Sequence, residues 1–248
     1  MRRRFFVDRF DADSATLSGN AAEHLGRVLR AEPGQLCELS DGNSVWLARI
    51  ERVALSKRGG NRVEFSLVEH VPAREPWLHL HLLMAVVKFD RFEWCLEKAT
   101  ELGVTEIVPL GAARTDKPLV AAAGKRRARW EKIVLESAQQ SRRLRPPVLG
   151  GERGAVRPAS AFAESAATLK ILFSERREAK PLHDVLRGGK GSSVGLAIGP
   201  EGGWTDDEIS SARASGFIET SLGENILRTE TAVLAALAIL RFALGSEK

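Results

Sequence analysis

The chain is poor in cysteine and has no long apolar run. Its 248 residues include two cysteines, Cys37 and Cys95, too few for a disulfide scaffold or a cysteine-based zinc site, and we expect no metal centre. The longest apolar stretches, residues 78–87 and 231–240, are well short of the roughly 18 residues that cross a membrane. The basic start, residues 1–8, has no apolar segment behind it, so we expect no signal peptide, no membrane partner and a cytoplasmic protein.

Positive charge is concentrated in one part of the chain. The net charge is +5, but residues 114–157 hold twelve Lys or Arg against four Asp or Glu, an excess of +8 that leaves the remainder at −3. Such an excess favours a polyanionic partner, in particular a nucleic acid. A solvated helix face followed by a basic loop is the alternative interpretation.

The first part of the chain has the pattern of a small β-barrel. One helix is expected over residues 21–29. Turn signals separate the short apolar segments, at Pro33-Gly34, Asp41-Gly42-Asn43 and Gly59-Gly60-Asn61. The strands that this spacing predicts are residues 5–7, 35–39, 44–50 and 62–67.

The pattern of predicted elements changes after a linker with two prolines, Val71–Pro76. Strands now alternate with helices, which is typical of an α/β domain with a mostly parallel sheet. The expected strands are residues 78–87, 105–110, 169–173, 194–198 and 217–222. We therefore expect two domains, residues 1–71 and residues 76–248.

The last predicted helix is apolar on every side, because no charged residue lies between Glu230 and Arg241. A helix that is apolar all round must be buried all round. We expect a dimer interface to supply the cover; burial within the chain is the alternative. We also expect Trp94 and Trp130 in the core rather than as stacking platforms.

A glycine loop follows the expected strand at residues 194–198. Its sequence is Gly199-Pro200-Glu201-Gly202-Gly203, and Thr205 with Glu208 forms a capping box that starts a helix. Strand, glycine loop and helix is the layout of ligand sites at the carboxyl ends of α/β strands. The loop matches no phosphate-binding pattern, and Glu201 would repel phosphate, so a neutral or cationic ligand fits better. A tight turn without a ligand is the alternative.

A second motif, residues 221–232, also follows a strand and opens a helix. Leu222-Gly223 makes the turn, Ile226-Leu227 offers an apolar floor, and Thr229 or Glu230 is expected to cap the helix. Arg228 is the strong cation of the motif. It either pairs with a neighbouring glutamate, Glu224 or Glu230, or faces negative charge on a substrate.

Both motifs resemble the C-terminal cofactor motifs of the SPOUT methyltransferases, in particular the bacterial small-subunit ribosomal RNA uridine-N3 methyltransferases of type E. One departure is Arg142, where the family often has a small residue. The other segments that agree, in family order, are Arg4-Phe5-Phe6-Val7, His24-Leu25-x-x-Val28-Leu29-Arg30-x-x-x-Gly34, Lys98-Ala99-Thr100-Glu101-Leu102-Gly103-Val104 and Gln140-Ser141-x-Arg143.

The resemblance implies an N-terminal PUA-like, RNA-binding β-barrel and a C-terminal SPOUT-type α/β domain with a trefoil knot. It implies S-adenosyl-L-methionine as cofactor and a homodimer with its two cofactor sites near the interface. The implied activity is methylation of N3 of a uridine in the RNA of the small ribosomal subunit (uridine 1498 in the usual numbering of that RNA), within the assembled subunit.

The resemblance also implies the site residues. Arg228 would stabilise the uracil anion, and Glu230 would act as a base or orient Arg228. The implied cofactor-binding residues are Phe173, Ser174, Glu175, Ile198, Gly199, Pro200, Glu201, Gly202, Gly203, Leu222, Gly223, Ile226, Leu227, Arg228, Thr231 and Ala232. The implied RNA-binding residues are His24, Arg27, Arg30, Lys88, Arg91, Arg114, Arg142, Arg143 and Arg145.

Several alternatives stay open. Lys88, Arg91 and Arg114 are candidates to act from the other subunit, and His24 either stacks on a base or packs on the barrel. A knotted methyltransferase of another target, such as a ribose 2′-hydroxyl or a transfer RNA base, is one rival. A non-catalytic RNA-binding assembly factor is the second, and a nucleotide-binding α/β enzyme, disfavoured by the acidic glycine loop, is the third.

Overall fold

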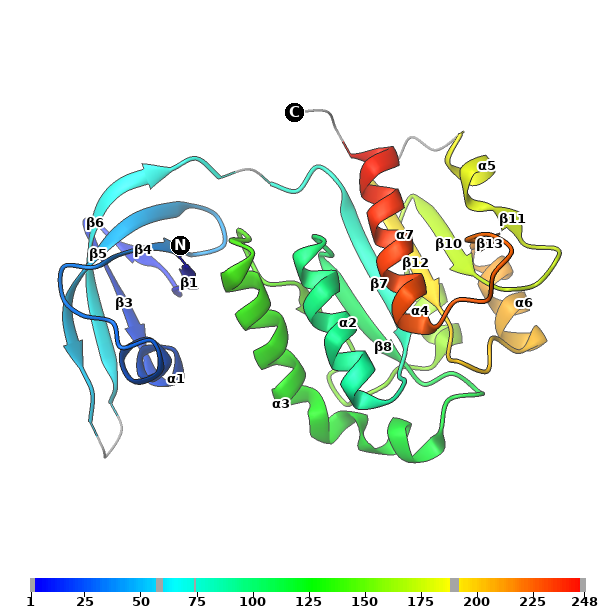
Figure 1. Cartoon of the computed structure of the whole chain (residues 1–248), viewed down its shortest axis with the longest axis horizontal. Coiled ribbons are helices and arrows are strands. Elements are labelled where there is room, and N and C mark those ends of the chain that lie inside the picture. The colour runs from blue at the N-terminus through cyan, green and yellow to red at the C-terminus, as the bar shows by residue number, and fades with distance from the viewer. Residues whose placement is uncertain (1–2, 57–59, 74, 188–191, 246–248) are drawn as a thin grey trace. The chain divides into compact units, whose positions relative to one another are not determined.

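The computed structural model describes residues 3–56, 60–73, 75–187 and 192–245 (Figure 1). Gly59 of the expected turn and Arg74 of the expected linker lie outside these residues. The chain divides into two compact units, one of Met1–Glu75 with Ala138–Arg145 and one of Pro76–Ser137 with Pro146–Lys248. Among the described residues, the helices are all too short or too polar to span a membrane.

The first unit is a curled sheet with strand order β1-β4-β5-β6-β3-β2 in the described residues. Neighbours run antiparallel except for β1 and β4, which are parallel. A short helix, α1 (Gly19–Glu23), continues into a π-helical turn, η1 (His24–Val28). The strands are β1 (Arg4–Phe6), β2 (Phe10–Asp11), β3 (Ser14–Ser18), β4 (Leu36–Ser40), β5 (Val45–Ala54) and β6 (Arg62–Val71).

The segment Ala138–Arg145 belongs to the first unit although it is far from it in sequence. Arg4 and Glu38 form a buried ion pair of 2.9 Å, and Arg4 also donates to the Arg142 carbonyl oxygen at 2.7 Å. Ser40 donates to the Leu144 carbonyl oxygen at 2.6 Å. Arg142 has a left-handed backbone, with φ of +53°. A glycine would adopt this conformation without the cost of roughly 1 kcal/mol that a side chain adds.

The second unit is built on a parallel sheet with strand order β11-β13-β10-β12-β7-β8-β9 in the described residues. The strands are β7 (His79–Ala85), β8 (Glu106–Leu110), β9 (Val148–Leu149), β10 (Leu169–Phe173), β11 (Lys180–Pro181), β12 (Ser193–Ile198) and β13 (Ile218–Ser221). The helices are α2 (Phe89–Glu101), α3 (Lys117–Gln140), α4 (Pro158–Glu164), α5 (Leu182–Leu186), α6 (Asp206–Ala214) and α7 (Thr229–Leu244).

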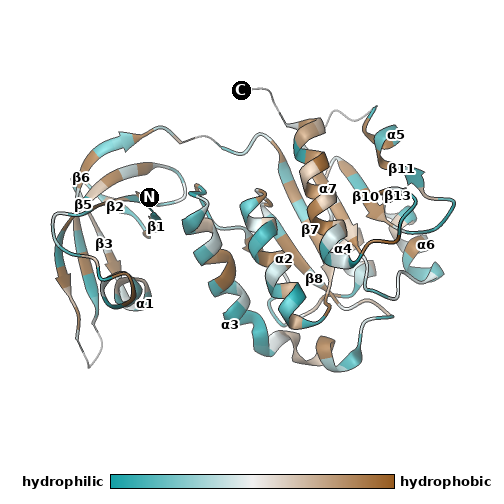
Figure 2. Cartoon of the chain, in the orientation of Figure 1, coloured by the Kyte–Doolittle hydropathy of each residue, from teal (hydrophilic) through white to brown (hydrophobic). Residues whose placement is uncertain are grey.

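Helices cover both faces of this sheet, because its strands are apolar on both sides. Leu80, Leu82 and Met84 of β7 share one core with residues of α2, α3 and α7. Leu83 and Ala85 of the same strand belong to a second core with α4 and α6. Figure 1 shows α2 and α7 side by side, and Figure 2 shows hydrophobic residues along the strands between the helix layers. The expected α/β architecture with a parallel sheet is confirmed.

The two tryptophans differ in their surroundings. Trp130 is buried in the core, as expected. Trp94 is 41% exposed, so the expectation that it lies in the core is wrong. Phe92 and Leu96 of the same helix face the core, and a residue two positions from each points to the opposite side of a helix.

Helix α7 is buried along one side only within the chain. Val233, Ala236, Leu237 and Leu240 are buried in the core. Ile239 and Phe242 are exposed, Phe242 by 91%. Burial within the chain therefore does not cover this apolar helix, and the alternative interpretation is wrong for these residues.

We expect both cysteines to resist thiol reagents in the folded protein. Burial raises the pKa of the Cys37 thiol and of the Cys95 thiol to about 12, and a neighbouring carboxylate, Glu38 or Glu230, adds to each shift. At pH 8 almost no reactive thiolate is then present. Ellman's reagent should label no cysteine of the native chain and two after denaturation; rapid labelling of the native chain would contradict this.

Candidate active site

The glycine loop has the conformation that its residues predict. The Gly203 amide donates to the Pro200 carbonyl oxygen at 2.9 Å, and Gly203 has a φ of +70°. The predicted capping box is confirmed. Thr205 accepts from the Glu208 amide through its side chain, and Glu208 accepts from the Thr205 amide at 2.9 Å through its own. The loop is thus held at both ends, by β12 and by the start of α6.

The second motif lies against the first. Thr229 donates to the Gly199 carbonyl oxygen at 3.2 Å, so a side chain of one motif contacts the backbone of the other. The expectation that Thr229 or Glu230 caps α7 is wrong, since Arg228 is the N-cap and its side chain makes no capping bond. The Thr229 hydroxyl bonds the glycine loop instead.

A pocket that is open to solvent lies between the two motifs. Its lining residues are Phe173, Ser174, Glu175, Ile198, Gly199, Pro200, Glu201, Gly203, Trp204, Leu222, Gly223, Asn225, Ile226, Leu227, Thr229 and Ala232. Three residues of the expected cofactor set, Gly202, Arg228 and Thr231, are not among them.

The residues that sequence reasoning missed in this lining are Trp204, Asn225 and Thr229. Trp204 explains the glycine at position 199, because a Cβ there would lie 3.0 Å from the indole ring. The indole nitrogen of Trp204 donates to the Phe173 carbonyl oxygen at 2.9 Å. The space at Gly199 is therefore limited by a protein side chain, in addition to any approach of a ligand.

A second hollow adjoins the pocket and shares three residues with it, Glu201, Ile226 and Leu227. Its other lining residues are Arg91 and Arg228. Within the described chain, the alternative for Arg228, an ion pair with Glu224 or Glu230, does not form, and Arg228 is exposed. A cation thus lies beside the pocket with its charge available to a ligand.

Glu230 lies in the first turn of α7, where the helix dipole favours a carboxylate. Its side chain is 18% exposed and 3.9 Å from Arg91. Its Oε2 atom is buried and accepts no hydrogen bond from the described residues. Arg91 also pairs with Glu201, so one guanidinium contacts an acid from each motif.

Arg91 and Arg114 contact the glycine loop of their own chain, at Glu201 and Gly202 respectively. Arg114 donates to the Gly202 carbonyl oxygen at 2.8 Å. In the sheet, β7 is the neighbour of β12, and β8 follows β7. Segments that follow neighbouring parallel strands meet at the same sheet edge. That these arginines act on the other subunit of a dimer stays a prediction. Lys88 is exposed at the N-terminal end of α2.

The other expected RNA-binding residues belong to the first unit. His24 and Arg27 lie on the π-helical turn, where Arg27 pairs with Glu23 at 2.7 Å. Arg30 is exposed and has a left-handed backbone, with φ of +51°. The segment Ala138–Arg145 carries the remaining arginines, Arg142, Arg143 and Arg145. The described residues contain no cluster of His, Cys, Asp or Glu that could hold a metal ion.

Two family models match the chain. An RNA methyltransferase domain matches residues 73–241, and an RNA methyltransferase PUA domain matches residues 17–56. Two similar proteins are each called ribosomal RNA small subunit methyltransferase E. The one from Synechocystis is 35% identical over 94% of this chain and 74% of its own length. The one from Bacillus subtilis is 30% identical over 97% of this chain and 96% of its own length.

Two solved methyltransferase structures are similar to this chain over nearly its whole length. The ribosomal RNA small subunit methyltransferase E of Neisseria gonorrhoeae, bound to S-adenosyl methionine, has a TM-score of 0.84 and 32% identity, with 98% of both chains covered. A putative methyltransferase of Legionella pneumophila, in complex with S-adenosyl methionine, has a TM-score of 0.83 and 32% identity, with both chains covered completely at 100%.

Proposed function

Since this chain belongs to the RNA methyltransferase family, we propose that it transfers a methyl group from S-adenosyl-L-methionine to the RNA of the small ribosomal subunit, at N3 of a uridine. The observation that carries the proposal is the closure of two distant motifs into one pocket, joined by the bond between Thr229 and Gly199. A relative named as a methyltransferase of small-subunit ribosomal RNA matches nearly the whole chain. We also propose that it acts in the cytoplasm, where small ribosomal subunits are assembled.

The pocket suits S-adenosylmethionine in the charge and character of its walls. Among the described lining residues, none is Lys or Arg, whereas Glu175 and Glu201 are acidic, Glu201 being paired with Arg91 outside the lining. Carboxylates favour a ligand with a sulfonium and an ammonium group. Phe173, Ile198 and Leu222 supply apolar walls for an adenine ring. When bound, the cofactor supplies an electrophilic methyl group on its positively charged sulfur.

The chain's own residues prepare the nucleophile. The N3–H of uracil is a weak acid, so N3 needs to lose its proton before it attacks. Arg228 stabilises the negative charge that then spreads to the uracil oxygens. Glu230 accepts the proton or orients Arg228 through its place beside Arg91. Because the hollow with Arg228 adjoins the pocket, a base held there lies next to the methyl donor, and such positioning is worth roughly 7–11 kcal/mol.

The active protein is a homodimer in this proposal. The exposed apolar side chains of α7, Ile239 and Phe242, support it, because burying them against a second copy removes them from water. The trefoil knot in the second unit is likewise part of the proposal. The substrate in this proposal is the RNA within the assembled small subunit.

The decisive experiment is transfer of a labelled methyl group to purified small subunits and, in parallel, to protein-free ribosomal RNA. We expect labelled N3-methyluridine in the digest of the subunits. A label on ribose or on another base would identify a different target in the ribosomal RNA, and cofactor binding without any transfer would identify a non-catalytic assembly factor. No calorimetric binding of S-adenosylmethionine would refute the proposal.

RNA binding should depend on salt through the arginines of the segment Ala138–Arg145. Each lost phosphate contact lowers the slope of log affinity against log salt by about one. A variant with alanine at Arg142, Arg143 and Arg145 should therefore bind ribosomal RNA with a slope smaller by about two to three. An unchanged slope in filter-binding titrations would remove these arginines from the RNA interface.

A further inference from the structure

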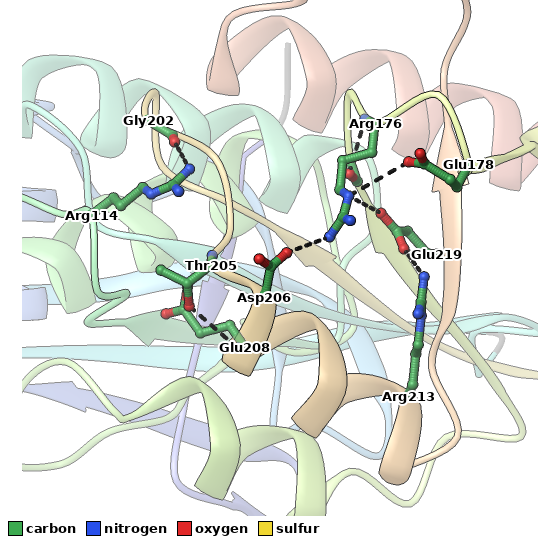
Figure 3. A network of polar contacts seen from close by, with 10 residues as sticks. Arg114, Arg176, Glu178, Gly202, Thr205, Asp206, Glu208, Arg213 and Glu219 are labelled. Atoms are coloured by element: carbon green, nitrogen blue, oxygen red, sulfur yellow. Dashed lines mark hydrogen bonds and ion pairs between the residues drawn. The ribbon is translucent and has the colours of Figure 1, made fainter.

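Arg176 joins three segments that border the cofactor pocket. It lies in the loop between β10 and β11, directly after the lining residue Glu175. Its guanidinium donates to Asp206 at 2.8 Å, at the start of α6, and lies 3.9 Å from Glu219 of β13 (Figure 3). The glycine loop ends just before Asp206, and the second motif begins just after β13. One side chain thus directly follows a lining residue and contacts the segments next to the glycine loop and the second motif.

Glu219 is the more important of these two partners of Arg176, because it is buried. Its side chain is only 5% exposed, and it receives a hydrogen bond of 2.6 Å from Arg213 on one oxygen. Its other oxygen, Oε1, is buried without a hydrogen bond from the described residues and faces Arg176. A buried carboxylate attracts a nearby cation far more strongly than an exposed one does. By contrast, the Asp206 side chain is 90% exposed, so that pair alone contributes little.

The loop that Arg176 anchors is otherwise held mainly through its backbone. The Ser174 amide donates to the Thr220 carbonyl oxygen at 3.0 Å, and the Ala179 amide to the Arg176 carbonyl oxygen at 3.1 Å. Residues 175–178 between them are exposed. Glu175 nevertheless lies so close to the glycine loop that a Cβ on Gly203 would be 2.5 Å from its Oε1 atom.

We propose that Arg176 is a positioning residue of the cofactor site, which holds Glu175 and the glycine loop at the separation that S-adenosylmethionine requires. The inference rests on the proposed function, because it assigns the pocket to that cofactor. It predicts an effect on cofactor binding that is separate from the methyl-transfer step and from RNA binding.

The test compares three variants with the wild type, by calorimetry with S-adenosylmethionine and by methyl-transfer kinetics. Arg176→Ala should raise the Kd and KM of the cofactor about ten-fold or more, while kcat at saturating cofactor and the KM of the RNA stay within about three-fold. Arg176→Lys should recover part of the affinity, because an ammonium restores the charge facing Glu219 without the second arm of the guanidinium.

Arg213→Ala is the matched control. The substitution removes the other arginine that pairs with the buried carboxylate of Glu219. Arg213 itself forms no ion pair with a pocket-lining residue in the described chain. We expect a lower melting temperature for Arg213→Ala and an unchanged cofactor Kd. Equal loss of affinity in Arg176→Ala and Arg213→Ala would assign the effect to general destabilisation and overturn the inference, as would wild-type affinity in Arg176→Ala. Failure of the wild type to bind would instead refute the proposed function.

Discussion

Replacing Arg228 with alanine is expected to lower kcat by about 10²- to 10³-fold, the usual effect of removing one donor from a developing anion. Cofactor affinity should stay within a few-fold of the wild type, because Arg228 lines the adjoining hollow and not the pocket itself. Its side chain neither caps α7 nor forms an ion pair among the described residues. The loss should therefore fall on the chemical step.

The measurement is single-turnover methyl transfer to small subunits, with cofactor affinity from calorimetry and folding from thermal denaturation. Arg228→Lys should recover part of kcat, since it keeps the charge and loses the planar donor pair. Arg187→Ala is the control, an exposed arginine of the same unit that lines neither the pocket nor the hollow. A collapse of cofactor affinity in Arg228→Ala would give this residue a structural role instead.

The parallel sheet was the most predictable part of the fold. The strand expected at residues 169–173 has those bounds in the structure, and the one expected at 194–198 differs by one residue. Strands buried on both faces are continuous apolar runs, which stand out in a sequence. The strand β3 (Ser14–Ser18) was missed, because only Ala15 and Leu17 of its five residues face the core.

The meeting of the two motifs could be expected from their order in the chain, but the contacts that hold them could not. Thr229 reads as a helix cap, because threonine is common there, and only the tertiary structure shows its hydroxyl on Gly199. The partners Arg176 and Glu219 are 43 residues apart and lie together because β10 pairs with β13. A lone sequence carries no signal for such a pairing. The trefoil knot stays a prediction from the family resemblance.

Replacing Gly203 with alanine is expected to raise the Kd of S-adenosylmethionine about ten-fold or more and to destabilise the fold modestly. At a φ of +70° an alanine costs about 1–2 kcal/mol of unfolding free energy. The added Cβ would also lie 2.5 Å from Oε1 of Glu175, the flexible end of a side chain that can move aside. Its displacement removes one wall of the pocket, so the larger effect should be on binding.

The control variant Gly216→Ala separates the loss of stability from the loss of cofactor affinity. Gly216 has a similar φ of +84°, and a Cβ there would meet nothing within 4 Å. The two variants should lose similar stability in urea denaturation, and only Gly203→Ala should lose cofactor affinity. In a Glu175→Ala background the clash is absent, so Gly203→Ala should add little further loss of affinity, and the double-mutant cycle should be strongly non-additive. Additive losses would mean that Gly203 acts on the cofactor by itself, through the close approach of its own backbone.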